Sequence, residues 1–194
     1  MRFIAATILF GLVASSLASP IPDNKHAKRG VLTQQSYDDF QISDGVAGNS
    51  VAEVLANFPV RFVLPQNATL SSYLHTNTSQ IDTSDLAGVA ASDLAIIQNS
   101  RLIAEAAETG AGGFDDELDA TSGDTTPLQN GKIKNKVLKL QLEVLGLQIE
   151  QAQGKDTSSQ ITTETTKLNT NIALDDAAAG EPSVGVTATF DGKA

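Results

Sequence analysis

The sequence contains no cysteine and no tryptophan, and its only histidines are His26 and His75. Without cysteine the chain has no disulfide framework and no thiolate nucleophile, so its core alone must hold the fold. A zinc site would lack its usual ligands, and a catalytic triad would have to use His75 as its base. We therefore expect no enzyme: no catalytic residue, no metal site and no cofactor.

Basic residues are also scarce: 13 Lys and Arg face 23 Asp and Glu, which gives a formal net charge of −10. An acidic surface argues against nucleic acid and anionic membranes as partners, because both carry the same sign of charge. The one basic cluster is "KIKNKVLK", with Lys132, Lys134, Lys136 and Lys139. It could bind an anionic ligand, but we favour neutralisation of the acidic excess within the molecule.

The acidic residues form no recognisable ligand pattern. The densest group, Asp115 to Asp119, could bind calcium or supply an acid/base pair of a hydrolase. It lacks the alternating ligands and central glycine of a calcium loop. A solvated acidic connector is the interpretation that we favour.

Long hydrophobic runs are missing except at the start of the chain. Arg2, the run "FIAATILFGLVASSLA" and small residues at Ser16 and Ala18 are typical of a secretory signal peptide, residues 1–18, cleaved after Ala18. The run is shorter than a membrane span requires. We therefore expect a secreted, extracellular protein without a membrane span.

A polar segment follows the signal peptide. Residues 19–29, "SPIPDNKHAKR", end in the dibasic pair Lys28-Arg29, which is typical of a processing site in an exposed spacer. Cleavage there would make Gly30 the first residue of the mature chain. Residues 30–180 then suffice for one domain with its own core, which we expect to be monomeric.

Periodicity predicts an all-α fold, a small bundle of four to six helices with a loose C-terminal tail over residues 181–194. The clearest helix starts with an N-cap at Thr126 and Pro127, carries two apolar rows and ends at Gly154. The two rows are Ile133, Val137, Leu140, Val144 and Leu147, and Leu138, Leu142, Leu145 and Ile149. Such a wide stripe predicts a central helix with two or more partners.

Weaker patterns predict the remaining helices. One region starts with an N-cap at Thr33 and is broken at Gly45 and Gly48, and its second part stops at Pro59. Further helices are expected from N-caps at Ser84 and Ser92. At most one helical turn is expected around Phe114, and a peripheral helix carries Ile161, Leu168 and Ile172.

Residues 60–80, "VRFVLPQNATLSSYLHTNTSQ", fit this helical pattern poorly. They could be an exposed loop with glycans on Asn67 and Asn77, which are valid acceptors, although so long a structureless loop is uncommon. "VRFVL" could be a strand, but no partner strand is evident.

The third interpretation is a retained intron. Val60-Arg61 can be encoded as GTAAGA, an intron donor, Thr76-Asn77 as ACTAAC, which contains a branch sequence, and Gln80 as the acceptor CAG. Excision would leave "AEVLANFPIDTSDLAGVAASDLAII", in which a short turn containing proline joins two helices. We favour this interpretation, under which both glycosylation sites and His75 would disappear.

Without residues 60–80, the chain resembles a family of small secreted fungal proteins often called effector-like. The resemblance rests on "RGVLTQQSYDDFQISDGVAGNSVAEVLANFP", "DLAGVAASDL", "LQNGKIKNKVLKLQLEVLGLQIEQAQG" and "LNTNIALDDAAAG". Such proteins generally lack a counterpart of residues 60–80. The resemblance implies a secreted fungal protein of undetermined biochemistry and supplies no catalytic residues.

These observations lead to one expected function and one alternative. The first is a secreted, non-enzymatic protein that binds an extracellular or host partner. The alternative is a protein that binds lipids or hydrophobic surfaces, suggested by the wide apolar stripe from Ile133 to Ile149.

Overall fold

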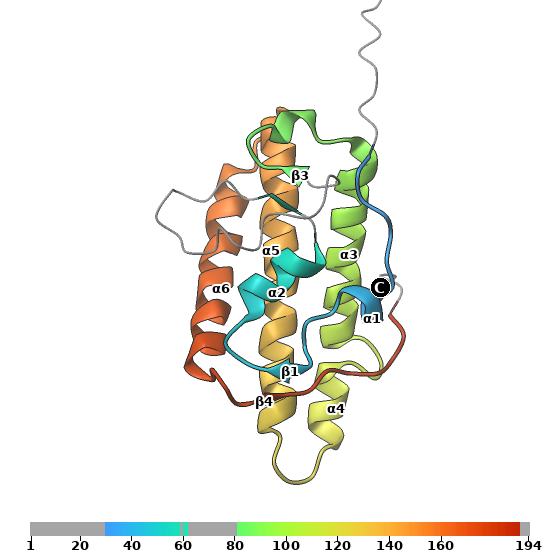
Figure 1. Cartoon of the computed structure of the whole chain (residues 1–194), viewed down its shortest axis with the longest axis vertical. Coiled ribbons are helices and arrows are strands. Elements are labelled where there is room, and N and C mark those ends of the chain that lie inside the picture. The colour runs from blue at the N-terminus through green and yellow to red at the C-terminus, as the bar shows by residue number, and fades with distance from the viewer. Residues whose placement is uncertain (1–29, 59, 62–80, 191–194) are drawn as a thin grey trace, which may run out of the picture.

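The computed structural model describes residues 30–58, 60–61 and 81–190, and its central element is the long helix α5 (Thr126–Ala152). The helices α3 (Ala91–Thr109) and α6 (Ser158–Ala177) both pack along α5. Figure 1 shows these three helices side by side, with α2 (Ser50–Asn57) in front of α5. The predicted all-α bundle is confirmed.

The position of α5 follows from its two apolar rows. The row Leu138, Leu142, Leu145 and Ile149 is buried in the main core together with residues of α1, α2 and α3. The other row is buried from Val137 to Leu147, while Ile133 at its start is half-buried. Burying a side chain of this size contributes about 1.5–3 kcal/mol, so a helix with two such rows is stable only at the centre of the bundle.

The predicted end of α5 at Gly154 is confirmed. Gly154 has a φ of 100°, which is the left-handed conformation that glycine adopts without strain. Its N–H donates to the carbonyl of Gln151, and the N–H of Lys155 donates to that of Glu150. These two bonds form a Schellman motif, which turns the chain into α6.

The first helix is shorter than we expected. Residues 30–36 form no helix, and α1 (Tyr37–Phe40) starts after Ser36 rather than at Thr33. Ser36 and Asp39 form a capping box, which stabilises a start at Ser36. The predicted break at Gly45 and Gly48 is confirmed, because both have a positive φ and separate α1 from α2.

Two further helix starts differ from the expectation. Instead of a short α-helix from Ser84, the chain forms the 3₁₀ helix η2 (Leu86–Gly88), whose N-cap is Asp85. The N-cap of α3 is Ala90 and not Ser92, because Ser92 already lies in the first turn. The acidic connector contains α4 (Phe114–Ala120), which is longer than the single turn expected around Phe114.

The C-terminal segment is the main correction to the predicted fold. We expected residues 181–194 to be loose, but the described part, 181–190, is packed against the bundle. The strand β4 (Pro182–Ser183) pairs antiparallel with β1 (Gly45–Val46). Beyond it, Val186 and Phe190 are buried, and the Phe190 ring meets the ring of Tyr37 edge to face at 5.3 Å.

The described residues on either side of 62–80 are paired strands. The strand β2 (Val60–Arg61) pairs in parallel with β3 (Ile81–Asp82), with Val60 opposite Ile81. The expectation that a strand here would lack a partner is therefore wrong. Paired strands lie about 4.8 Å apart, so Val60 and Ile81 are neighbours.

Candidate functional site

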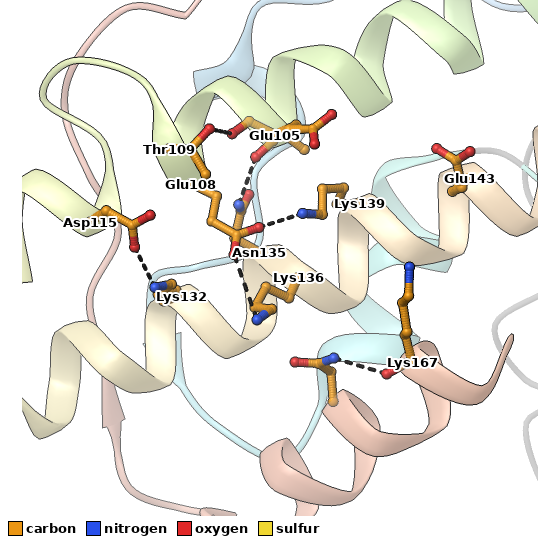
Figure 2. Close-up of polar contacts among 12 residues, drawn as sticks. Glu105, Glu108, Thr109, Asp115, Lys132, Asn135, Lys136, Lys139, Glu143 and Lys167 are labelled. Carbon is orange, nitrogen blue, oxygen red and sulfur yellow. Dashed lines mark hydrogen bonds and ion pairs between the residues drawn. The ribbon is translucent and has the colours of Figure 1, made fainter. Parts of the chain in front are cut away.

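The four lysines of the basic cluster project from α5 in three directions, and each is paired with a carboxylate. Lys132 pairs with Asp115 of α4, and Lys134 pairs with Glu53 of α2 at 2.8 Å. Lys136 and Lys139 both pair with Glu108 of α3 (Figure 2). The structure thus confirms neutralisation within the molecule for this cluster.

Lys134 is the most buried of the four. Its side chain is 0% exposed, and its ammonium group donates to the carbonyls of Asp44 at 2.9 Å and Val46 at 3.0 Å. The pair with Glu53 compensates the buried charge. Lys134 therefore ties α5 to β1 and α2, which is a structural role.

Lys136 and Lys139 open into a groove of about 360 Å³, whose floor is α5 and whose walls are α3 and α6. It is lined by four basic residues and four acidic ones, together with Leu140 and Asn171. The charged residues are Arg101, Lys136, Lys139, Lys167, Glu105, Glu108, Glu143 and Glu164. We call this surface the charged groove.

Ion pairs hold the charged side chains of the groove. Arg101 pairs with Glu105 on its own helix and with Glu143 on α5. Glu108, whose side chain is 10% exposed, lies between Lys136 and Lys139. On α6, Lys167 pairs with Glu164 at 2.8 Å and is the more exposed partner. The groove therefore presents charges of both signs that are joined in ion pairs.

A buried polar network lies next to the charged groove. The Tyr37 hydroxyl donates to Asn135 Oδ1 at 2.9 Å, and Asn135 Nδ2 donates to the Ala104 carbonyl at 2.8 Å. Burial raises the pKa of Tyr37 well above its ordinary value of 10.0, so the hydroxyl remains a donor. The network thus joins α5 to α1 through Tyr37 and to α3 through Ala104.

The acidic connector is part of the fold as well. Asp115 pairs with Lys132, and Asp116 accepts a hydrogen bond from the Gly112 N–H at 2.9 Å. In the part of the chain that the structure describes, no group of three or more His, Cys, Asp or Glu side chains could hold a metal ion. Within the same part, no helix combines the length and apolar character needed to cross a membrane.

The predicted processing and glycosylation residues lie outside the described residues. These are Ala18, Lys28, Arg29, Asn67 and Asn77, and His75 lies outside them too. Sequence reasoning missed the buried carboxylates of Asp93 and Asp175, which bind backbone N–H groups distant in the chain. Asp93 carried a weak signal, since an acidic residue in a first helical turn is a common cap.

The fold and the site define this protein as a small all-α bundle with a charge-paired groove along its central helix. The chain belongs to a family known as a domain of unknown function, DUF8454, whose model matches residues 32–187. No curated protein and no solved structure matches the chain.

Proposed function

We propose that this protein is secreted and acts without catalysis, by binding an extracellular or host protein through the charged groove. The proposal includes a place among the effector-like secreted proteins of fungi, which rests on the sequence resemblance. The observation that carries the binding function is the gathering of eight charged side chains, joined in ion pairs, around one groove.

The contacts in the groove favour binding over acid/base chemistry. Each of its four glutamates accepts a bond or an ion pair from Lys or Arg. A general acid or base must exchange its proton with a substrate, which a carboxylate engaged by a fixed cation does poorly. The described residues also contain no His and no Cys that could act as base or nucleophile.

The charge pattern also fits a protein partner. A groove with four cations and four anions is neutral as a whole, on a chain with a formal net charge of −10. A surface that carries charges of both signs favours a partner with the complementary pattern and disfavours others, because like charges placed opposite each other are costly. The rim residue Lys167 is well placed to contact a partner, because its side chain is 56% exposed.

The test is affinity capture from host or extracellular extracts with the protein and two charge-reversal variants. Lys167→Glu reverses the charge of one lysine in the lining of the charged groove. Lys155→Glu makes the same change at an exposed lysine outside the groove lining, where Lys155 also pairs with one glutamate, Glu150. We expect Lys167→Glu to lower capture about tenfold, as juxtaposed like charges imply, and Lys155→Glu to leave it unchanged.

Two results would contradict the proposal. Equal capture by both variants would exclude the charged groove as the binding surface. If the unmodified protein captured no more than an unrelated acidic protein of similar size, the binding function itself would be wrong. Thermal unfolding of both variants checks that each keeps the native fold.

The lipid-binding alternative rested on the apolar rows of α5. Both rows are buried against neighbouring elements from Val137 to Ile149. Leu140 borders the charged groove, and Leu142 and Leu147 border a second hollow of about 300 Å³ between α3 and α5. Half of the lining of that hollow is polar or charged, from Gln98, Arg101, Glu143 and Glu150, which does not suit an apolar ligand. The large apolar side chains that are exposed lie on different segments of the chain: Val31, Val46, Leu102, Leu174 and Val184. The structure thus offers this alternative no specific support.

A further inference from the structure

Asp93 is a buried carboxylate on α3 that binds the start of the described chain. It is 3% exposed, and both of its oxygens accept from the Val31 N–H, at 2.9 and 3.0 Å. The Leu32 N–H donates to Oδ1 at 2.9 Å. Among the described residues, no Lys or Arg forms an ion pair with Asp93. Backbone N–H groups stabilise this buried carboxylate, and a cation placed beside it would stabilise its charge further.

Gly30 lies directly against this carboxylate. A Cβ atom on Gly30 would lie 2.7 Å from Asp93 Oδ1 and 2.4 Å from Ser92 Oγ, so any larger residue would displace these atoms. A backbone nitrogen is about 2.5 Å from the Cβ of its own residue. The Gly30 nitrogen therefore lies within about 5 Å of Asp93 Oδ1, a range in which opposite charges stabilise each other strongly.

Processing would place a cation at this nitrogen. An endoprotease that cleaves after Lys28-Arg29 adds one water across the Arg29–Gly30 peptide bond. Arg29 then ends in a carboxylate, and Gly30 carries an amino group. With an ordinary pKa of about 8, this group is mostly an ammonium ion at neutral pH. A neutral amide is thus replaced by a cation next to a buried anion.

We propose that the ammonium group of Gly30, freed by this cleavage, binds the Asp93 carboxylate and fastens the mature N-terminus to α3. The inference rests on the secretion proposed above and on the cleavage expected after Arg29. Cleavage then does more than remove the residues before Gly30: it also stabilises the mature fold. The precursor, in which the same nitrogen is an amide, lacks this ion pair.

The experiment compares processed and unprocessed protein secreted from a host that cleaves after Lys-Arg pairs. The full-length gene yields the processed form, and the double variant Lys28→Ala/Arg29→Ala yields the unprocessed form. Both are made in the natural background, with Asp93→Asn, and with Asp175→Asn as the matched control. Asp175 is also buried and accepts from two backbone N–H groups, those of Gly48 and Ser50, at 2.9 and 3.0 Å.

We expect processing to raise the urea midpoint of unfolding in the natural background and with Asp175→Asn, but not with Asp93→Asn. The same gain in all three backgrounds, or no gain in the natural one, would overturn the proposal. A processed chain that begins at a residue other than Gly30 would overturn the processing step as well. Partner capture by the unprocessed variant tests the binding function separately, so the two proposals can fail independently.

Amine labelling provides a second readout if Asp93→Asn does not fold. The Gly30 amine of the native protein is compared with that of the free peptide GVLTQQSY at neutral pH. We expect labelling to be about tenfold slower in the protein, because an ion pair that raises the pKa by one unit lowers the reactive free amine by this factor. Equal rates would overturn the proposal.

Discussion

At the scale of single residues, the structure separates two lysines that look alike in the sequence. Lys132 and Lys134 lie two positions apart on α5, and each pairs with one carboxylate. Lys134 is fully buried and also binds two carbonyls, whereas Lys132 pairs with an aspartate whose side chain is 46% exposed. Burial therefore decides how much each ion pair contributes to the stability of the fold.

Substitution of these lysines by methionine tests that distinction. Lys134→Met leaves the Glu53 charge uncompensated and removes the donor to the Asp44 and Val46 carbonyls, which should cost about 3–5 kcal/mol. Lys132→Met should cost less than about 1 kcal/mol, as expected for a pair near the surface. Urea unfolding measures both. Equal losses would contradict the structural role of Lys134.

The capping box at α1 gives a prediction on pH. The hydrogen bonds from the Ser36 hydroxyl and N–H hold the pKa of Asp39 below its ordinary value of 3.8. Because the folded pKa is the lower one, this stabilisation is present above pH 3.8 and is lost as the pH falls through the folded pKa. Ser36→Ala should therefore raise the pKa of Asp39 towards 3.8, as followed by NMR titration.

Asp124 is the internal control for this titration. Its pKa is also lowered, by hydrogen bonds from Thr126, which Ser36→Ala does not touch. The pKa of Asp124 should therefore be the same in both proteins. If the pKa of Asp39 also stayed unchanged, Ser36 would not be the cause of its shift.

At the scale of elements, the C-terminal segment is a structural part of the bundle. Truncation after Gly180 removes β4, Val186 and the Phe190 ring that contacts Tyr37, and it should lower the free energy of unfolding by about 4 kcal/mol. Truncation after Phe190 is the matched control and should change it by less than about 0.5 kcal/mol. Similar stability of both truncated chains in thermal unfolding would contradict this role.

The pairing of Val60 with Ile81 agrees with the retained-intron interpretation. Because Val60 and Ile81 are strand partners, Ile81 could take the place of Val60 with a shift of about one strand spacing. We predict that the natural protein, digested on the amino side of aspartates, yields the peptide DGVAGNSVAEVLANFPI. A peptide that continues from Pro59 into VRFVLPQNATL would show that the segment is part of the mature protein.

At this scale, the sequence could predict the features that depend on residues close together in the chain. The two rows of α5 and its end at Gly154 follow from spacing and from one glycine conformation, so they were predictable. The buried role of residues 181–190 was not, because it depends on contacts such as that of Gly185 with Asp44, 141 residues away. The binding of Val31 by Asp93, across 62 residues, escaped prediction for the same reason.

At the scale of the whole molecule, α5 organises both the core and the candidate site. It packs against α3, α6 and α2. Its lysines form ion pairs with α4, with α2 and with the α3 side of the charged groove. The sequence predicted the cluster and its neutralisation. It did not predict the groove, because Arg101, Glu143 and Lys167 come together only through the packing of three helices.

Secretion and cleavage after Arg29 underlie both proposals for this protein, and one measurement tests the two steps directly. Protein isolated from the extracellular fraction is digested on the amino side of aspartates, since trypsin would itself cut after Arg29. We predict an N-terminal peptide GVLTQQSY, which begins at Gly30 with a free amino group. The peptide DNKHAKRGVLTQQSY, or a protein found only inside cells with its first residues intact, would contradict the account.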